Sequence, residues 1–254
     1  MRLLVVGGCG QVGSMVLPHL AAAHEIRVLD LAGPAHPVST VEYHAGDLHD
    51  VDLVAELARG AESLVFMSMG PKRDWGSPAT ARANLDIAVP GLYATLTGVH
   101  RAGVRHVVYT SSMSVYRYPL GGAEPPPDKP AQTDGRIGRY PDESVPPDAT
   151  DFYGLAKRLG EAVCRNATVE WGIDAICLRL CFPTPDEEWP REGTAMQRAI
   201  ATSARDVAAA IDAALHRRGH GFDAYAISGD TTGRTMSLAK ARRELGWAPR
   251  DPTS

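Results

Sequence analysis

The 254-residue sequence has little of several features that mark special classes of protein. Aromatic residues make up only 6% of it, and the formal net charge at pH 7 is only −4. No apolar run approaches the roughly 18 residues that a membrane-spanning helix needs. A nearly balanced charge gives no general attraction to nucleic acid or to an anionic membrane. We therefore expect a globular protein of the cytoplasm that binds neither nucleic acid nor a membrane.

Cysteine is also scarce, and it is absent from the patterns that bind metals. The cysteines are Cys9, Cys164, Cys177 and Cys181, with no Cys-x-x-Cys pair and no histidine cluster at zinc spacing. We expect four reduced thiols and no metal site. Hydrophobic residues at 44% and charged residues at 22% are ordinary for a domain with a buried core. The length allows one large domain, or one domain with a small addition.

Short apolar runs alternate with helical patterns along most of the chain. Strands are expected at 3–6, 26–29, 41–44, 64–67, 104–109, 173–180 and 224–227. Helices are expected at 11–23, 51–58, 79–101, 151–167, 203–217 and 238–245. Continuous apolar strands separated by helices are typical of a parallel sheet that is covered on both faces. This pattern predicts an α/β fold of the Rossmann type, with a doubly wound parallel sheet.

Proline is concentrated in one segment. Residues 117–148 hold eight of the 19 prolines, which makes a regular helix or a central strand unexpected there. Long segments of this kind usually have a function or are disordered, so 117–148 is a candidate substrate lid or a surface loop. We expect residues 1–170 to form a nucleotide-binding domain that carries this loop. Residues 171–254 would supply the last strands and a small substrate-binding region.

Four glycines lie between the first strand and the first helix, within Gly7-Gly8-Cys9-Gly10-Gln11-Val12-Gly13. Small residues let the backbone turn tightly and approach a pyrophosphate, which the N–H groups of the helix N-terminus can bind. Asp30 ends the second strand, where a carboxylate can accept hydrogen bonds from a ribose and repel a 2′-phosphate. Because no arginine follows Asp30 directly, the pattern favours NAD over NADP.

Two further positions could support acid–base chemistry. Tyr153 and Lys157 are four residues apart, so they share one face of a helix. A nearby ammonium would lower the tyrosine pKa from about 10 and let the phenol exchange a proton with a hydroxyl or carbonyl. Ser111 and Ser112 follow the fifth strand, at the sheet edge where sites of open α/β folds lie. Serines at such places also serve simply as caps or turn residues.

In their order and spacing, these motifs resemble the NAD-dependent epimerase/dehydratase family, the extended branch of the short-chain dehydrogenases/reductases. The resemblance runs from the glycine loop to Leu245-Gly246-Trp247-Ala248-Pro249. It implies that the catalytic residues are Ser112, Tyr153 and Lys157. It implies cofactor contacts from Gly7, Gly10, Gln11, Val12, Gly13, Asp30, Asp47, Leu48, Met67, Ser68, Asn84 and Lys157. Substrate contacts would come from Ser112, Met113, Ser114, Tyr153 and Arg191.

The resemblance also implies a role for each catalytic residue. Tyr153 would be the base in oxidation and the acid in reduction, Lys157 would lower its pKa, and Ser112 would orient the reacting oxygen. Dehydratases of the family generally have Asp-Glu where this chain has Met113 and Ser114, so a dehydratase is disfavoured. The short C-terminal region suits a small substrate and resembles the compact uronate dehydrogenases. Those enzymes carry a carboxylate-binding arginine at about the place of Arg191, although a surface salt bridge there is equally open.

The leading hypothesis is an NAD-dependent oxidoreductase that acts on a small sugar, sugar acid or polyol. An epimerase, in which NAD is reduced and reoxidised within one turnover, remains open. A nucleotide-sensing protein without catalysis is a third possibility, which the presence of Ser112, Tyr153 and Lys157 disfavours. The resemblance further implies a homodimer that is formed by the helices expected at 79–101 and 151–167.

Overall fold

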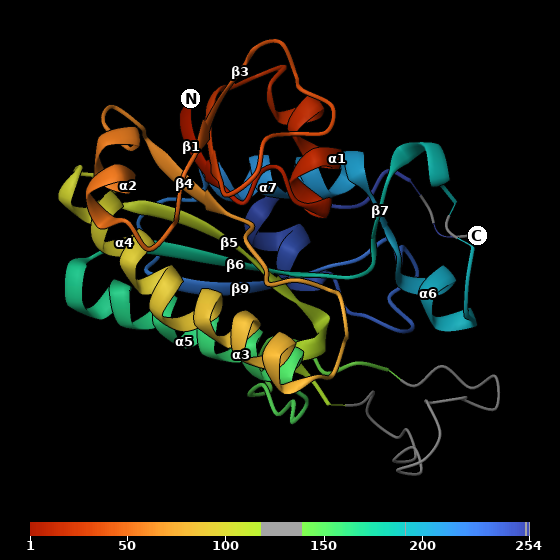
Figure 1. Ribbon diagram of the computed structural model, residues 1–254. Coiled ribbons are helices and arrows are strands. Elements are labelled where there is room, and N and C mark those ends of the chain that lie inside the picture. The colour runs from red at the N-terminus through yellow and green to blue at the C-terminus, as the bar shows by residue number, and fades with distance from the viewer. Residues whose placement is uncertain (118–138, 191, 252, 254) are drawn as a thin grey trace.

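The computed structural model describes residues 1–117, 139–190, 192–251 and 253. Its centre is a seven-stranded sheet in the order β3-β2-β1-β4-β5-β6-β9, and all neighbouring strands are parallel (Figure 1). The strands are β1 (Arg2–Val6), β2 (Glu25–Asp30), β3 (Val41–Ala45), β4 (Ser63–Phe66), β5 (His106–Ser112), β6 (Asp174–Leu180) and β9 (Phe222–Ile227). From β1, the strands β2 and β3 follow on one side of the sheet and β4, β5, β6 and β9 on the other, as in the Rossmann arrangement. The predicted fold class is therefore confirmed.

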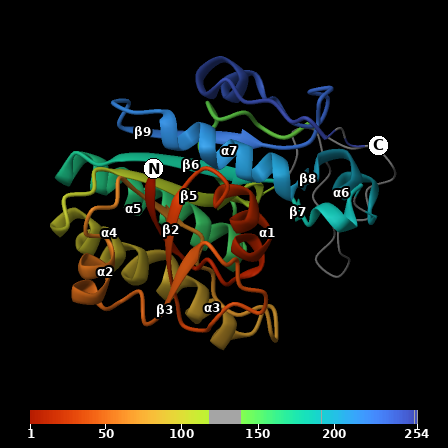
Figure 2. The same cartoon turned by 90° about the horizontal axis from the view of Figure 1, so that it is seen from above.

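Helices cover both faces of the sheet (Figure 2). They are α1 (Gln11–Leu20), α2 (Val51–Leu57), α3 (Pro78–Asp86), α4 (Leu92–Arg101), α5 (Phe152–Trp171) and α7 (Ala204–His216). α1 and α7 pack together on one face, while α2, α4 and α5 lie on the other. Leu3 and Val5 of β1 belong to one core cluster, and Leu4 and Val6 belong to the other. Both faces of the strand are buried, which explains its uninterrupted apolar sequence.

The helix expected at 79–101 is interrupted, so that prediction was wrong in its middle. A π-helical turn at Ile87–Gly91 separates α3 from α4 and contains Pro90. Proline has no N–H to donate, and in a regular helix its ring clashes with the carbonyl four residues earlier. The wider turn removes this conflict. Pro18 lies inside α1, and that helix ends at Leu20, three residues before its expected end.

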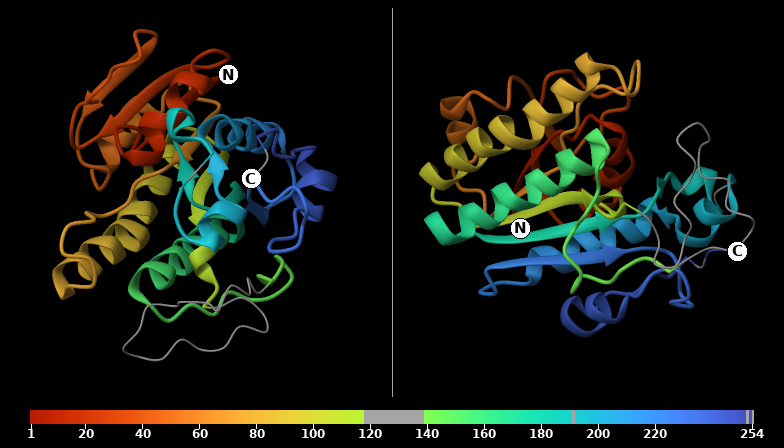
Figure 3. Two further views of the ribbon diagram at one scale, coloured as in Figure 1. Left: turned by 90° about the vertical axis from the view of Figure 1, so that its right-hand side faces the viewer. Right: turned by 90° about the horizontal axis from the view of Figure 1, so that it is seen from below.

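The chain after β6 leaves the sheet at the carboxyl ends of its strands and then returns (Figure 3). β7 (Pro183–Thr184) pairs with β8 (Thr202–Ser203) in a small separate sheet, and α6 (Ala195–Ile200) lies between them in sequence. The helix expected at 238–245 is mainly a π-helical turn, Ala241–Leu245. The division of the chain at residue 170 stays a prediction, since β6 and β9 complete the same sheet as the earlier strands.

Residues 118–138 of the proline-rich segment lie outside the described residues, so the lid hypothesis stays a prediction. The described end of the segment is fixed to the sheet. Glu143 Oε1 accepts a hydrogen bond from the backbone N–H of Ala226, in the edge strand β9, at 2.7 Å. Tyr140 is buried, and its hydroxyl donates to Met196 Sδ at 3.2 Å. This end therefore contributes to the core rather than to an exposed loop.

Three expectations from the sequence can be compared with the described part of the chain: free thiols, no metal site and no membrane-spanning helix. All four cysteines are free thiols, and three of them are buried. Within the described ranges, no group of three or more His, Cys, Asp or Glu side chains is placed to hold a metal ion. None of the helices searched there combines the length and the apolar character needed to cross a bilayer.

Candidate active site

A cleft of about 770 Å³ follows the carboxyl edge of the sheet. Its walls come from the loops that follow β1 to β6 and from the start of α5. Thirteen sequence-predicted site residues line it: Gly7, Gly10, Gln11, Val12, Asp30, Leu48, Met67, Ser68, Ser112, Met113, Ser114, Tyr153 and Lys157. The volume lies within the range of pockets that hold small ligands and cofactors. The structure therefore brings most of the predicted site into one cavity.

The glycine loop forms the floor of the cleft where β1 passes into α1. Gly7 has φ +83°, and a Cβ atom there would collide with the backbone of Ser68. Gly13 does not line the cleft, but a Cβ atom on it would collide with the carbonyl oxygen of Gly8. No side chain caps the N-terminus of α1. Its first N–H groups are therefore available to an anion, as the pyrophosphate prediction requires.

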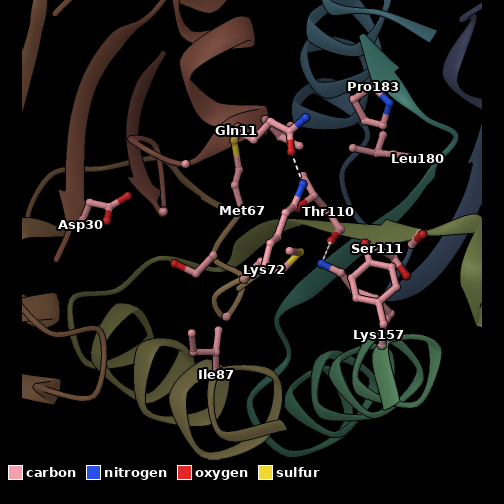
Figure 4. A pocket seen from close by; sticks show the side chains of 18 of the residues that line it. Gln11, Asp30, Met67, Lys72, Ile87, Thr110, Ser111, Lys157, Leu180 and Pro183 are labelled. Carbon is pink, nitrogen blue, oxygen red and sulfur yellow. Dashed lines mark hydrogen bonds between the residues drawn. The ribbon is translucent and has the colours of Figure 1, made fainter. Parts of the chain in front are cut away.

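Asp30 lies at one end of the cleft, as Figure 4 shows. Its carboxylate accepts a hydrogen bond from the backbone N–H of Cys9 at 2.9 Å, which fixes it beside the glycine loop. The walls around it are apolar and are formed by Leu29, Leu31, Gly46, Leu48 and Ile87. A carboxylate beside an apolar slot suits the ribose and the base of an adenosine.

The catalytic candidates lie at the other end, where β5 meets α5. Asp151 caps α5 by accepting hydrogen bonds from the N–H groups of Tyr153 and Gly154. Tyr153 forms a hydrogen bond with the Ser112 side chain. Lys157 Nζ donates to the carbonyl oxygen of Thr110 at 2.7 Å. A hydroxyl, a phenol and an ammonium are thus held together at the end of one strand.

The expected effect of Lys157 on Tyr153 is not what this structure shows. Burial raises the pKa of Tyr153, and only the hydrogen bond with Ser112 opposes the rise. The Lys157 ammonium is 6.0 Å from the centre of the Tyr153 ring and points to Thr110 instead. Burial lowers the pKa of Lys157 itself, to about 8. Desolvation is therefore the largest cause of the shift at both groups, and the predicted lowering of the tyrosine pKa by Lys157 was wrong.

A buried ion pair between β6 and α5 stabilises the carboxyl end of β5. Arg179 of β6 donates two hydrogen bonds to Glu161 of α5, at 2.9 and 2.8 Å. Ser111 Oγ donates to the same carboxylate at 2.7 Å. Ser111 and Ser112 therefore have different surroundings: Ser111 is tied to the Glu161 pair, whereas Ser112 contacts Tyr153. This supports the choice of Ser112 as the serine that meets the substrate.

Besides Gly13, two predicted cofactor contacts lie outside the main cleft, Asn84 and Asp47. Asn84 is buried and holds the chain after β4, because its amide accepts from the N–H of Gly70 and donates to the carbonyl of Pro71. Asp47 is bonded to His49, both to its N–H and to its ring. The roles of Asn84 and Asp47 at a cofactor stay predictions. Arg191 lies outside the described residues.

The residues that line the cleft and that sequence reasoning missed include Lys72, Trp75 and Phe182. Lys72 reaches across it to the side chain of Gln11, as Figure 4 shows. Trp75 lies beside Tyr153, and Phe182 lines the cleft with a positive φ of 38°. Lys72 and Trp75 belong to a loop without regular structure, so no periodic pattern marked them. The sequence did offer one signal for Trp75, because a tryptophan soon after the strand expected at 64–67 lies near the sheet edge where sites are found.

The profile of the family described as "NAD dependent epimerase/dehydratase family" matches residues 3–220, which include the main sheet except Arg2 of β1 and all of β9. The chain belongs to this family. The NAD-dependent epimerase/dehydratase family is one of enzymes, so the predicted enzyme class is confirmed. Its profile spans the glycine loop, Asp30, Ser112, Tyr153 and Lys157.

Individual proteins that match this chain share less than 30% of its residues in the three cases that follow. The L-arabinose 1-dehydrogenase (NAD(P)(+)) of Haloferax volcanii is 23% identical over 264 residues, which cover 98% of this chain and 96% of that protein. UDP-glucose 4-epimerase of Streptomyces lividans is 29% identical over 197 residues, which cover 69% of this chain and 50% of that protein. The crystal structure of uronate dehydrogenase from Agrobacterium tumefaciens superposes with a TM-score of 0.77. That match has 21% identity and covers 99% of this chain and 85% of the other.

Proposed function

We propose that this protein is an NAD-dependent dehydrogenase of a small sugar, sugar acid or polyol, with Tyr153 as its acid–base group. One observation carries the proposal. A single cleft connects the carboxylate of Asp30, the uncapped start of α1 and the hydrogen-bonded Ser112 and Tyr153 side chains. Such a cleft can hold a dinucleotide along its length and a small substrate at the tyrosine end.

The residues of the cleft fit NAD in chemistry and in shape. Asp30 can accept hydrogen bonds from the adenosine ribose, and Gly10, Gln11 and Val12 lie where the pyrophosphate would meet the helix N-terminus. Gly7 and Gly13 have no space for a side chain, which keeps the floor of the cleft low. When bound, the nicotinamide ring accepts a hydride from the substrate or returns one.

The protein itself moves the proton. In oxidation, ionised Tyr153 accepts the proton of the substrate hydroxyl as the carbon that bears it loses a hydride and becomes a carbonyl carbon. In reduction, the phenol returns that proton. Ser112 orients the substrate oxygen beside Tyr153. Lys157 donates to the carbonyl of Thr110 and so holds the end of β5 beside Tyr153. Burial lowers its pKa to about 8, so its positive charge is present below that pH.

Known relatives support a small substrate. The chain spans 96% of the L-arabinose 1-dehydrogenase and only 50% of the UDP-glucose 4-epimerase that it matches. We therefore favour oxidation of a free sugar over the transformation of a sugar nucleotide. A carboxylate contact from Arg191 stays a prediction within this proposal.

The test is incubation of the purified protein with NAD and a panel of free aldoses, uronates and acyclic polyols. We expect NADH to accumulate with at least one member, and Tyr153→Phe to remove that activity. If no member of the panel yields NADH, the dehydrogenase proposal is wrong.

The family name and the match to UDP-glucose 4-epimerase keep an epimerase as the second candidate. An epimerase would retain NAD through purification and would interconvert sugar epimers without net NADH. Chromatography of the sugar products and measurement of the bound nucleotide separate the two reactions. A protein that is purified free of nucleotide and releases NADH contradicts the epimerase.

We also propose a homodimer through α4 and α5. Their outer surfaces carry exposed apolar side chains, including Tyr93, Leu159 and Val169, and Val169 is 83% exposed. Large exposed apolar residues on neighbouring helices favour an interface. Light scattering coupled to gel filtration should give twice the mass of the chain, and Val169→Glu should shift the mass toward the monomer. The location in the cytoplasm stays a prediction.

A further inference from the structure

The loop between β4 and α3 places an aromatic ring at the catalytic end of the cleft. The indole of Trp75 lies 5.5 Å from the ring of Tyr153 and 4.7 Å from that of Phe152, measured between ring centres. Trp75 is nevertheless 51% exposed. An exposed tryptophan in contact with a catalytic candidate has a large apolar surface that a ligand could cover.

The loop that carries Trp75 is anchored along its length. Asn84 holds its beginning through the N–H of Gly70, and Thr80 Oγ1 donates to the carbonyl of Arg73 at 2.7 Å. The backbone has a positive φ on both sides of the tryptophan, 51° at Asp74 and 91° at Gly76. A left-handed conformation at an aspartate is uncommon and marks a constrained turn. The position of the indole is therefore built into the fold.

The catalytic end of the cleft has an apolar side and a polar side. Met69, Met113, Phe182 and Pro183 join Trp75 among the apolar lining residues. The polar residues Ser112 and Ser114, which follow β5, and Tyr153 of α5 also line the cleft there. A ligand that fits both must itself have one apolar face and a rim of hydroxyl groups.

We infer that Trp75 binds the C–H face of a ring-closed sugar, so that the substrate is a cyclic sugar or sugar acid and not an open-chain polyol. A pyranose or furanose ring gathers its C–H bonds on one face, and burial of that face against an indole is favourable. An acyclic polyol has no such face, and its free rotations are lost on binding. This inference rests on the proposed dehydrogenase and selects among its possible substrates.

The first experiment measures steady-state kinetics for the wild type, Trp75→Ala, Trp75→Phe and Trp171→Phe. With ring-closed substrates, we expect Trp75→Ala to raise KM about tenfold, which corresponds to about 1.4 kcal/mol of lost binding. Its kcat should fall by less than about threefold, because the acid–base group is intact. Trp75→Phe should restore most of the KM. Trp171→Phe, at the far end of α5, should match the wild type.

A second experiment reads binding without turnover. In a Tyr153→Phe background with NAD present, addition of a cyclic sugar should change the tryptophan emission. Trp75→Phe should abolish that change, and Trp171→Phe should retain it. Because Trp75 is half exposed, its replacement by phenylalanine leaves the core packing intact.

The outcomes separate this inference from the proposed function. Turnover of acyclic polyols alone would support the dehydrogenase and overturn the role of Trp75. Unchanged KM for a cyclic substrate in Trp75→Ala would also overturn it. Binding of cyclic sugars at Trp75 without NADH formation would support the inference and contradict the dehydrogenase. The lack of both turnover and sugar binding would overturn both proposals.

Discussion

The two ends of β5 use polar side chains in opposite ways. At its amino end, His106 is 1% exposed and both of its ring nitrogens are bonded within the protein, to Ser63 Oγ at 3.2 Å and to the carbonyl of Arg217 at 3.0 Å. At its carboxyl end, Ser112 bonds Tyr153 and faces the cleft. At the amino end, the polar side chain is therefore bonded within the protein and stabilises the fold. At the carboxyl end, a polar side chain faces the cleft and is available to a ligand.

Parallel strands create this difference. All seven strands point the same way, so the loops that follow them meet at one edge, together with the N-termini of the helices that they enter. Positive helix ends and free backbone N–H groups gather at that edge. At the opposite edge lie the C-termini of helices and the loops that enter the strands. Their carbonyl groups are bonded by partners within the protein; His106, for example, bonds the carbonyl of Arg217 at the end of α7. The comparison predicts that changes at the carboxyl end affect activity, and that changes at the amino end affect stability.

The largest effect is expected for Tyr153→Phe. Loss of the hydroxyl removes the proton acceptor, so kcat should fall by a factor on the order of 10³. The free energy of unfolding should change by only about 1 kcal/mol, because the phenol makes one hydrogen bond. Steady-state kinetics and urea unfolding measure the two quantities. Tyr43→Phe, in β3 and away from the cleft, is the matched control and should keep its kcat.

Arg179→Met tests whether buried residues at the carboxyl end of the sheet also contribute to stability. The change leaves the Glu161 carboxylate buried without its partner, which should cost about 3–5 kcal/mol in the free energy of unfolding. Urea unfolding gives this value. The double variant with Glu161→Gln should recover part of the loss, since no charge is then left unpaired. A cost below about 1 kcal/mol would show that the pair does not stabilise the strand end.

His106 predicts the pH dependence of stability at the amino end. Burial lowers its pKa from 6.5 to about 4, so between these values the unfolded chain binds a proton that the folded chain does not. Stability is therefore lost as the pH falls from about 6.5 to about 4, by up to about 3 kcal/mol. Urea unfolding at several pH values measures the slope, and His106→Gln should flatten it. An equal slope in the variant would assign the effect to other groups.

The smallest effect is expected at Asp30. Asp30→Ser removes the carboxylate that repels a 2′-phosphate, so the ratio of kcat/KM for NAD to that for NADP should fall about tenfold. Thermal stability should be nearly unchanged, which fits a carboxyl-end residue. Asp52→Asn, on an exposed side chain of α2, is the control for charge loss. A ratio that stays constant would place cofactor selection elsewhere.

The sequence predicted the sheet well because its signals are local. Apolar runs mark the strands, and glycines that have no room for a Cβ atom mark the turn after β1. The same local signals could not show the interruption at Pro90, where the wider turn accommodates the proline. Nor could they show that burial at the end of β5 raises the pKa of Tyr153 and lowers that of Lys157, because burial depends on segments far apart in sequence.

The candidate site was predictable where a motif has a fixed spacing and unpredictable where a loop supplies the residue. Ser112, Tyr153 and Lys157 come from regular elements and meet as expected. Trp75 comes from a loop whose shape depends on Asn84 and Thr80, in the helix that follows. Residues of this kind become visible only when the anchoring hydrogen bonds are known.

The contact between Gly7 and Ser68 has a consequence for how this protein can change over generations. Any side chain at position 7 would collide with the backbone at position 68, so the two loops have no independent freedom. The loop that begins at Ser68 leads directly to Trp75. A substitution that adds a side chain at position 7 must therefore also displace the start of the loop that carries Trp75, the wall proposed for the substrate.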